Sequence, residues 1–170
     1  MARDEDEDYE QWEQAQEGAE LLREGETDAA IADLERVIEA DSTNPYAHYF
    51  LGAAHFEKGN FDKAMKAYVL ALERAPDYIG AMVALGHTLR MLGRYDQALR
   101  MGRQILAKKP DDGEALHLMG LVHYARGEEA AAANYLRRFL DTRPELEVAQ
   151  EARGLLEILE GRATFEEPAD

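Results

Sequence analysis

The stretch Pro45–Tyr78, PYAHYFLGAAHFEKGNFDKAMKAYVLALERAPDY, decides how the chain folds. Its apolar residues recur at helical spacing, with a turn predicted at Gly59-Asn60 and a stop for the second helix near Pro76. The first predicted helix is almost wholly apolar over 46–56, and the second carries one apolar stripe. A single hairpin cannot bury this much apolar surface, so we expect it to stack on copies of itself.

Those copies are visible as residues that recur every 34 positions. The series are Gly18, Gly52, Gly86, Gly120 and Gly154; Gly25, Gly59, Gly93, Gly127 and Gly161; Ala30, Ala64, Ala98 and Ala132; and Pro76, Pro110 and Pro144. The first glycines lie inside helices, where Gly costs about 1 kcal/mol relative to Ala, so a neighbouring helix is expected to approach closely there. The second glycines are expected to end the first helix of each hairpin at positive φ. Asp28, Asp62 and Asp96 follow as candidate N-caps.

This pattern resembles the tetratricopeptide repeat (TPR), a 34-residue helix-turn-helix with the pattern W-x₂-L-G-x₂-Y…A-x₃-F…P. The matching residues of the second repeat are Leu51, Gly52, Ala64, Tyr68 and Pro76, while His48 and His55 replace the family's Trp and Tyr. The resemblance implies an all-α, right-handed solenoid of antiparallel helix hairpins.

The spacing divides the chain into repeats 11–44, 45–78, 79–112 and 113–146, and the resemblance adds a closing helix at 147–161. We expect one TPR domain over 11–161, a disordered acidic tail at 1–10 and a flexible C-terminal tail at 162–170. Gly102 stands where the other repeats have Leu or Tyr. Either a neighbour's large side chain fills the space beside it, or the third repeat is locally soft.

The charge distribution excludes several classes of partner. The net charge is −16, and residues 1–44 alone carry 16 acidic and 3 basic groups. Nucleic acid and anionic membranes are therefore poor partners, because both need a basic face. The chain has no cysteine, no apolar run long enough to span a membrane, and an acidic N-terminus unlike a secretory signal, so we expect a cytoplasmic protein.

The resemblance implies that the first helices of the repeats line a concave groove that binds a partner protein, as a peptide or a helix. Helical spacing places these candidate groove residues on that face: Trp12, Tyr46, Tyr49, Phe56, Val83, His87, Arg90, His117, Leu121 and Tyr124. Aromatic residues and Arg are typical of interface hot spots, although aromatics can also pack as ordinary core between repeats. The positions of the clamp with which some TPR proteins hold acidic chaperone tails carry no carboxylate-binding residue here: Ala15, Ala19, Phe50, Gly80 and Ala84.

Neither catalysis nor cofactor binding is indicated. The chain lacks a cysteine nucleophile and a phosphate-binding Gly-rich loop, so we predict that it is not an enzyme and needs no cofactor. A metal site built from histidines is a remote alternative, because His55 and His123 lie two repeats apart, too far to share an ion. They are expected to replace the family's Tyr at helix contacts.

Self-association is the second functional hypothesis. The predicted last helix has an apolar stripe that should close the core of the fourth repeat: Val148, Ala152, Leu155, Leu156 and Leu159. Ile158 then remains on the outside, so a homodimer could form through this end. The leading hypothesis is a non-enzymatic scaffold that binds a protein of unknown identity.

Overall fold

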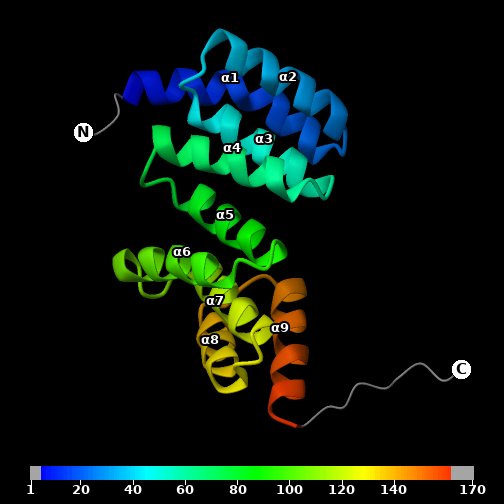
Figure 1. The fold of residues 1–170 in the computed structure, drawn as a ribbon, viewed down its shortest axis with the longest axis vertical. Helices are drawn as coiled ribbons and strands as arrows, with labels where there is room; N and C mark the ends of the chain where they lie inside the picture. The colour runs from blue at the N-terminus through cyan, green and yellow to red at the C-terminus, as the bar shows by residue number, and fades with distance from the viewer. Residues whose placement is uncertain (1–4, 162–170) are drawn as a thin grey trace, which may run out of the picture. The chain divides into compact units, whose positions relative to one another are not determined.

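The computed structural model describes residues 5–161 and contains nine α-helices in that span (Figure 1). Their bounds are α1 Glu5–Arg23, α2 Thr27–Ala40, α3 Pro45–Glu57, α4 Phe61–Arg74, α5 Ile79–Met91, α6 Tyr95–Lys108, α7 Gly113–Ala125, α8 Glu129–Asp141 and α9 Leu146–Leu159. No strand occurs among the described residues. Each predicted repeat holds two of these helices and α9 follows them, so the predicted all-α hairpin fold is confirmed.

The turn inside each hairpin is built around a glycine, as the spacing predicts. Gly25, Gly59, Gly93 and Gly127 all have positive φ, between 71° and 81°. In the second repeat the Gly59 N–H donates to the Phe56 carbonyl and the Asn60 N–H to the His55 carbonyl, at 2.9 and 2.8 Å. These bonds satisfy carbonyls that the end of α3 leaves without intrahelical partners.

The predicted N-caps are wrong by two positions. Helix α2 begins at Thr27 and α6 at Tyr95, so Asp28 and Asp96 lie inside the first turn rather than at the cap. Their carboxylates instead form ion pairs with basic residues thirty positions later in the sequence, Asp28 with Lys58 and Asp96 with Arg126. An acidic residue in the first turn is also favoured by the helix dipole.

Contacts within the chain group its helices into two compact units. Unit 1 extends to Arg94 and contains α1–α5, and unit 2 starts at Tyr95 and contains α6–α9. The boundary falls in the turn of the third repeat. A single domain over 11–161 stays a prediction.

Unit 1 is held together by small residues at close helix contacts. A Cβ on Gly18 would lie 2.5 Å from the Leu34 side chain, and one on Gly52 would lie 2.7 Å from the Tyr68 ring. Leu34 is fully buried with the small residues Ala15, Ala30 and Ala47. The helical glycines of the 34-residue pattern therefore allow large side chains of the second helix to reach the first.

In unit 2, the structure shows what occupies the space beside Gly102. The side chain of Met119, from α7, occupies the space that a Cβ on Gly102 would need, so a neighbour fills the gap. The core of this unit joins Leu116, Leu136, Phe139 and Ala152, with three α9 residues packed against it: Val148, Leu155 and Leu159. Helix α9 thus closes the core of the fourth repeat as expected.

The N-terminal end of α1 corrects the expectation of a disordered tail. Glu5–Glu10 form the first turns of α1, whereas residues 1–4 and the predicted tail at 162–170 lie outside the described residues. Acidic side chains in the first turn favour this helix through its dipole. One of them, Asp8, also accepts a hydrogen bond from the Tyr46 hydroxyl at 2.9 Å.

Asn44 joins α1 to α3. Its side-chain oxygen accepts from the backbone N–H groups of Tyr46 and Ala47, each at 3.0 Å, and so caps α3. Its amide donates to the Gln11 carbonyl in α1 at 2.8 Å, and the whole residue is buried. This side chain therefore links α1 directly to the aromatic start of α3.

Candidate partner-binding surface

Five partly exposed aromatic side chains of unit 1 form a connected group, named here the aromatic cluster: Trp12, Tyr46, Tyr49, Phe50 and Tyr78. The buried Tyr68 ring also contacts Tyr49, with centroids 5.8 Å apart. Trp12 of α1 contacts two rings of α3, with centroids 5.3 Å from Tyr46 and 5.7 Å from Phe50. Tyr78, just before α5, lies 4.9 Å from Tyr49 and 5.6 Å from Tyr46. Each such pair contributes about 0.5–1.5 kcal/mol beyond its buried area, so the cluster is firmly held.

The cluster is only partly covered by the rest of unit 1. Trp12 is 41% exposed, and Tyr46, Tyr49, Phe50 and Tyr78 are half-buried. Burial raises the pKa of the Tyr78 hydroxyl, with nearby Tyr49 as a second cause, so this group stays protonated at neutral pH. The aromatics thus contribute to packing between repeats and also remain partly exposed to solvent.

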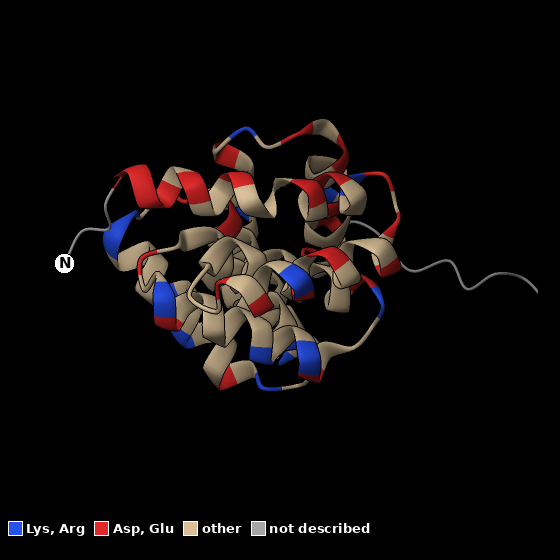
Figure 2. Cartoon of the chain, turned by 90° about the horizontal axis from the view of Figure 1, so that it is seen from above, with Lys and Arg blue, Asp and Glu red and all other residues tan. Residues whose placement is uncertain are grey.

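Helix α1 gives this surface an acidic border. It carries eight acidic residues and one basic residue, Arg23 at its last position. Figure 2 shows the acidic positions along the helix that begins beside the N label. Asp8, which Tyr46 holds by its hydrogen bond, is the acidic group tied directly to the cluster.

The other predicted groove residues of unit 1 lie outside this cluster. Phe56 packs against Phe61 of α4, with ring centroids 5.2 Å apart. Val83 is only 7% exposed and belongs to the core, whereas His87 and Arg90 are half-buried.

Sequence reasoning missed two members of the cluster. Phe50 was considered only as a clamp position, and Tyr78 was not considered as a groove residue. Tyr78 is the last residue of the second repeat, where the chain enters α5. An aromatic residue at the junction between repeats is the signal that could have indicated it.

In unit 2 the predicted groove residues are all on α7. His117 stacks on Phe139 of α8 with centroids 4.6 Å apart and an angle of 18°. Leu121 is half-buried, and Tyr124 is 38% exposed.

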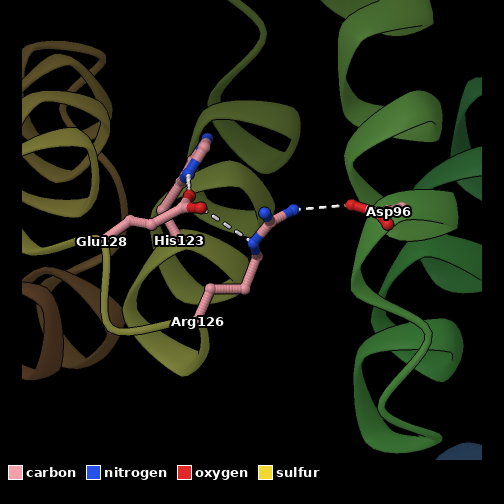
Figure 3. Close-up of polar contacts among 4 residues, drawn as sticks. All are labelled: Asp96, His123, Arg126 and Glu128. Atoms are coloured by element: carbon pink, nitrogen blue, oxygen red, sulfur yellow. Dashed lines mark hydrogen bonds and ion pairs between the residues drawn. The ribbon is translucent and has the colours of Figure 1, made fainter.

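His123, one of the two histidines predicted at helix contacts, makes local contacts. His123 contacts Glu128 through Nδ1 and Oε2 at 2.5 Å (Figure 3). The imidazole also stacks on the Tyr135 ring. Arg126 extends this network, reaching Glu128 at 2.9 Å and Asp96 of α6 at 2.6 Å. The hydrogen bond to His123 is the main cause that lowers the pKa of Glu128.

The histidines of α3 have different surroundings. His48 Nε2 lies 3.0 Å from the Ser42 carbonyl oxygen. His55 Nδ1 is buried and has no hydrogen-bond partner among the described residues, and burial lowers the pKa of this imidazole. Over residues 5–161, no three His, Cys, Asp or Glu side chains converge as metal ligands would.

Comparison with known proteins establishes the family. Two family models, both described as tetratricopeptide repeat, match residues 21–86 and 83–147. The chain therefore belongs to the tetratricopeptide repeat family, whose members generally mediate protein–protein interactions and whose repeat is non-enzymatic.

Curated relatives share part of their length with this chain. The human Superkiller complex protein 3 is 29% identical over 125 residues, which are 74% of this chain and 8% of that protein. A TPR repeat-containing protein of Methanocaldococcus jannaschii is 34% identical over 92 residues, 54% of this chain and 15% of the relative. The chain thus spans less than a fifth of the length of either relative.

Solved structures share the fold over most of the chain. A thermophilic TPR protein of Thermus thermophilus superposes with a TM-score of 0.73 at 25% identity, covering 89% of this chain and 84% of that one. MamA of Desulfovibrio magneticus RS-1 gives 0.72 at 21% identity, covering 85% and 82%. None of the helices within residues 5–161 is long and apolar enough to cross a membrane.

Proposed function

We propose that this chain is a non-enzymatic scaffold that binds a partner protein on the aromatic cluster of unit 1. The supporting observation is the cluster itself, five aromatic rings from three parts of unit 1 with Trp12 41% exposed. The family supports protein binding in general.

The cluster has the physical properties of a binding hot spot. Its rings are held by one another and by the Tyr46–Asp8 hydrogen bond, so little side-chain entropy is lost when a partner binds. Trp and Tyr are the residue types that most often dominate interface energies, at about 2 kcal/mol or more each when a partner covers them.

A peptide selection tests this function. A random peptide library is displayed and selected on the purified chain, and the affinities of enriched peptides are measured by calorimetry. The double variant Trp12→Ala, Tyr49→Ala should raise Kd at least about thirtyfold, because the loss of even one hot spot of about 2 kcal/mol has that effect. Leu70→Ala is the matched control, because Leu70 is 38% exposed on α4 and lies outside the cluster.

Two results contradict the proposal: a library that yields no enriched peptide, or peptides that bind the double variant as tightly as the wild type. Tyr124→Ala is a further comparison, since Tyr124 was predicted as a groove residue but belongs to unit 2. We expect this variant to bind the selected peptides as tightly as the wild type.

Self-association is the second candidate, and one observation favours it. Leu146, at the start of α9, is 68% exposed, more than the other large hydrophobic residues found exposed over 5–161. Sedimentation equilibrium of the wild type and Leu146→Ser would decide it. A mass that stays at 19.1 kDa across concentrations would exclude the homodimer.

A further inference from the structure

We propose that the partner of the aromatic cluster is a cationic segment, with an arginine that stacks on Trp12 and pairs with the carboxylates of Glu5 and Asp8. Apolar side chains beside this arginine would contact Tyr46 and Tyr49. The inference rests on the proposed function and specifies the charge of the segment that binds there.

The first step is the position of the acidic groups on α1. Glu5, Asp8 and Trp12 follow one another at spacings of three and four residues, so they lie along one face of the helix. At 1.5 Å per residue, Asp8 lies about 6 Å and Glu5 about 10 Å from Trp12 along the helix axis. Because helical side chains lean toward the N-terminus, the indole is directed toward the turn that carries Asp8, and a guanidinium stacked on the ring can reach this carboxylate with its edge.

The second step is that the site is held in place before a partner arrives. The Tyr46 hydroxyl donates to Oδ2 of Asp8 at 2.9 Å, and the Tyr46 ring meets Trp12 edge to face at an angle of 86°. A carboxylate offers about four acceptor positions, so Asp8 can bind a guanidinium while it keeps the bond from Tyr46. The aromatic platform and the anion are therefore oriented by the same tyrosine.

The third step is the charge of the surrounding helices. Helices α1 and α3 together carry nine acidic residues, while Arg23, at the far end of α1, is their single Lys or Arg. Over residues 5–94, unit 1 has 19 acidic and 8 basic residues, a net charge of −11. Such a field attracts a cationic segment and repels an acidic one, which agrees with the lack of a carboxylate clamp in this chain.

Arginine fits this site better than lysine. Its planar guanidinium stacks on an indole ring and still presents several N–H donors at its edge. A lysine ammonium would be attracted by the same charges but would gain less from the flat face of Trp12.

The test uses the fluorescence of Trp12, which is the single tryptophan of the chain. The full chain is titrated with a capped nonapeptide of alternating leucine and arginine, and with versions in which lysine, serine or glutamate replaces arginine. We expect the arginine peptide to change the emission saturably and to bind at least about tenfold more tightly than the serine peptide, with the lysine peptide between them. The glutamate peptide should give no saturable change.

Two matched double variants distinguish the effect of the carboxylates beside Trp12 from that of the overall negative charge of unit 1. Glu5→Gln with Asp8→Asn removes two charges beside Trp12 and leaves an acceptor for Tyr46, and we expect about a fivefold or greater loss of affinity for the arginine peptide. Glu24→Gln with Glu39→Gln removes two exposed charges elsewhere in unit 1 and should change it less than about twofold. Circular dichroism confirms that both variants fold.

The experiments distinguish a wrong cationic partner from a wrong proposed function. If the serine or glutamate peptide binds as tightly as the arginine peptide, or if both double variants weaken binding equally, the cationic partner is wrong but the aromatic surface stands. If none of the four peptides alters the Trp12 emission, the cationic partner is wrong. The proposed function also fails if, in addition, the library yields no binder.

Discussion

Units 1 and 2 are built on the same 34-residue pattern but use their exposed positions differently. In unit 1, rings from α1, α3 and the start of α5 contact one another beside a strongly acidic helix. In unit 2, His117 and His123 each stack on a residue of α8, and an ionic network joins the α7–α8 turn to α6. The buried pattern thus sets the scaffold, while residues outside it give each unit its own surface.

The largest effect is expected at a buried position that both units share. Leu34 and Leu136 occupy equivalent places three repeats apart, and both are fully buried. Truncating either to Ala should lower the free energy of unfolding by about 3 kcal/mol, because it leaves a cavity in the core. Urea denaturation measures both, and a difference above about 1.5 kcal/mol would show that the repeats are not energetically equivalent.

Asn44 and Asp112 test how helix capping differs between the units. Both cap the first helix of a repeat, but Asn44 also donates to the Gln11 carbonyl of α1. We expect Asn44→Ala to cost about 2 kcal/mol and Asp112→Ala about 1 kcal/mol, because the Asn44 variant loses the buried hydrogen bond to Gln11 as well as the cap. Equal losses in urea denaturation would mean that the bond to Gln11 contributes nothing.

Gly52 and Gly102 test whether an added Cβ is tolerated less well beside a rigid ring than beside a flexible side chain. A Cβ on Gly52 would meet the rigid Tyr68 ring at 2.7 Å, whereas the one on Gly102 would meet the end of the flexible Met119 side chain. Helix propensity favours Ala over Gly by about 1 kcal/mol and offsets part of any clash. Thermal unfolding should show Gly52→Ala destabilised by about 1–2 kcal/mol and Gly102→Ala within about 0.5 kcal/mol of the wild type. The reverse order would contradict the packing argument.

The smallest effect is a difference in pH dependence. Because burial lowers the pKa of His55 below its usual 6.5, the unfolded chain binds this proton more readily than the folded one. Stability from neutral His55 is therefore complete above about pH 6.5 and is lost as the pH falls toward the folded pKa. Glu128 in unit 2 affects stability at lower pH. Its contribution to the free energy of unfolding is present above about pH 4.5 and is lost as the pH falls through its lowered pKa.

Unfolding of the wild type and His55→Gln at pH 5 and pH 7.5 measures this difference. The variant lacks the imidazole, so its stability should decline less between the two pH values. Identical declines would show that His55 does not contribute to the pH dependence.

Much of the scaffold could be predicted because its constraints are local or periodic. The glycines of the turns adopt the expected positive φ, and Gly18 and Gly52 lie at the expected close contacts. The ends of the helices were harder to predict, because helix caps depend on the backbone geometry of a few residues. Asp28 and Asp96, predicted as N-caps, are ion-pair partners instead.

The aromatic cluster could be predicted only in part. Spacing placed Trp12, Tyr46 and Tyr49 on one face, but Val83 is buried and Phe56 pairs with Phe61. Tyr78 joins the cluster from the connection between α4 and α5, which helical spacing does not describe. The length of α1 was also missed, because the charge run lacks apolar periodicity, whereas the structure shows a Tyr46–Asp8 hydrogen bond and acidic residues in the first turn, which the helix dipole favours.

The sequence by itself determined the repeat, the helix pairs and the acidic character of the N-terminal region, because the 34-residue spacing and the charge count do not depend on contacts between distant residues. Tertiary structure alone decided which aromatics meet, that Met119 fills the space at Gly102, and that Asp8 lies beside Tyr46. These outcomes depend on side-chain size and orientation across helices far apart in the chain. Residue spacing along one helix carries no information about them.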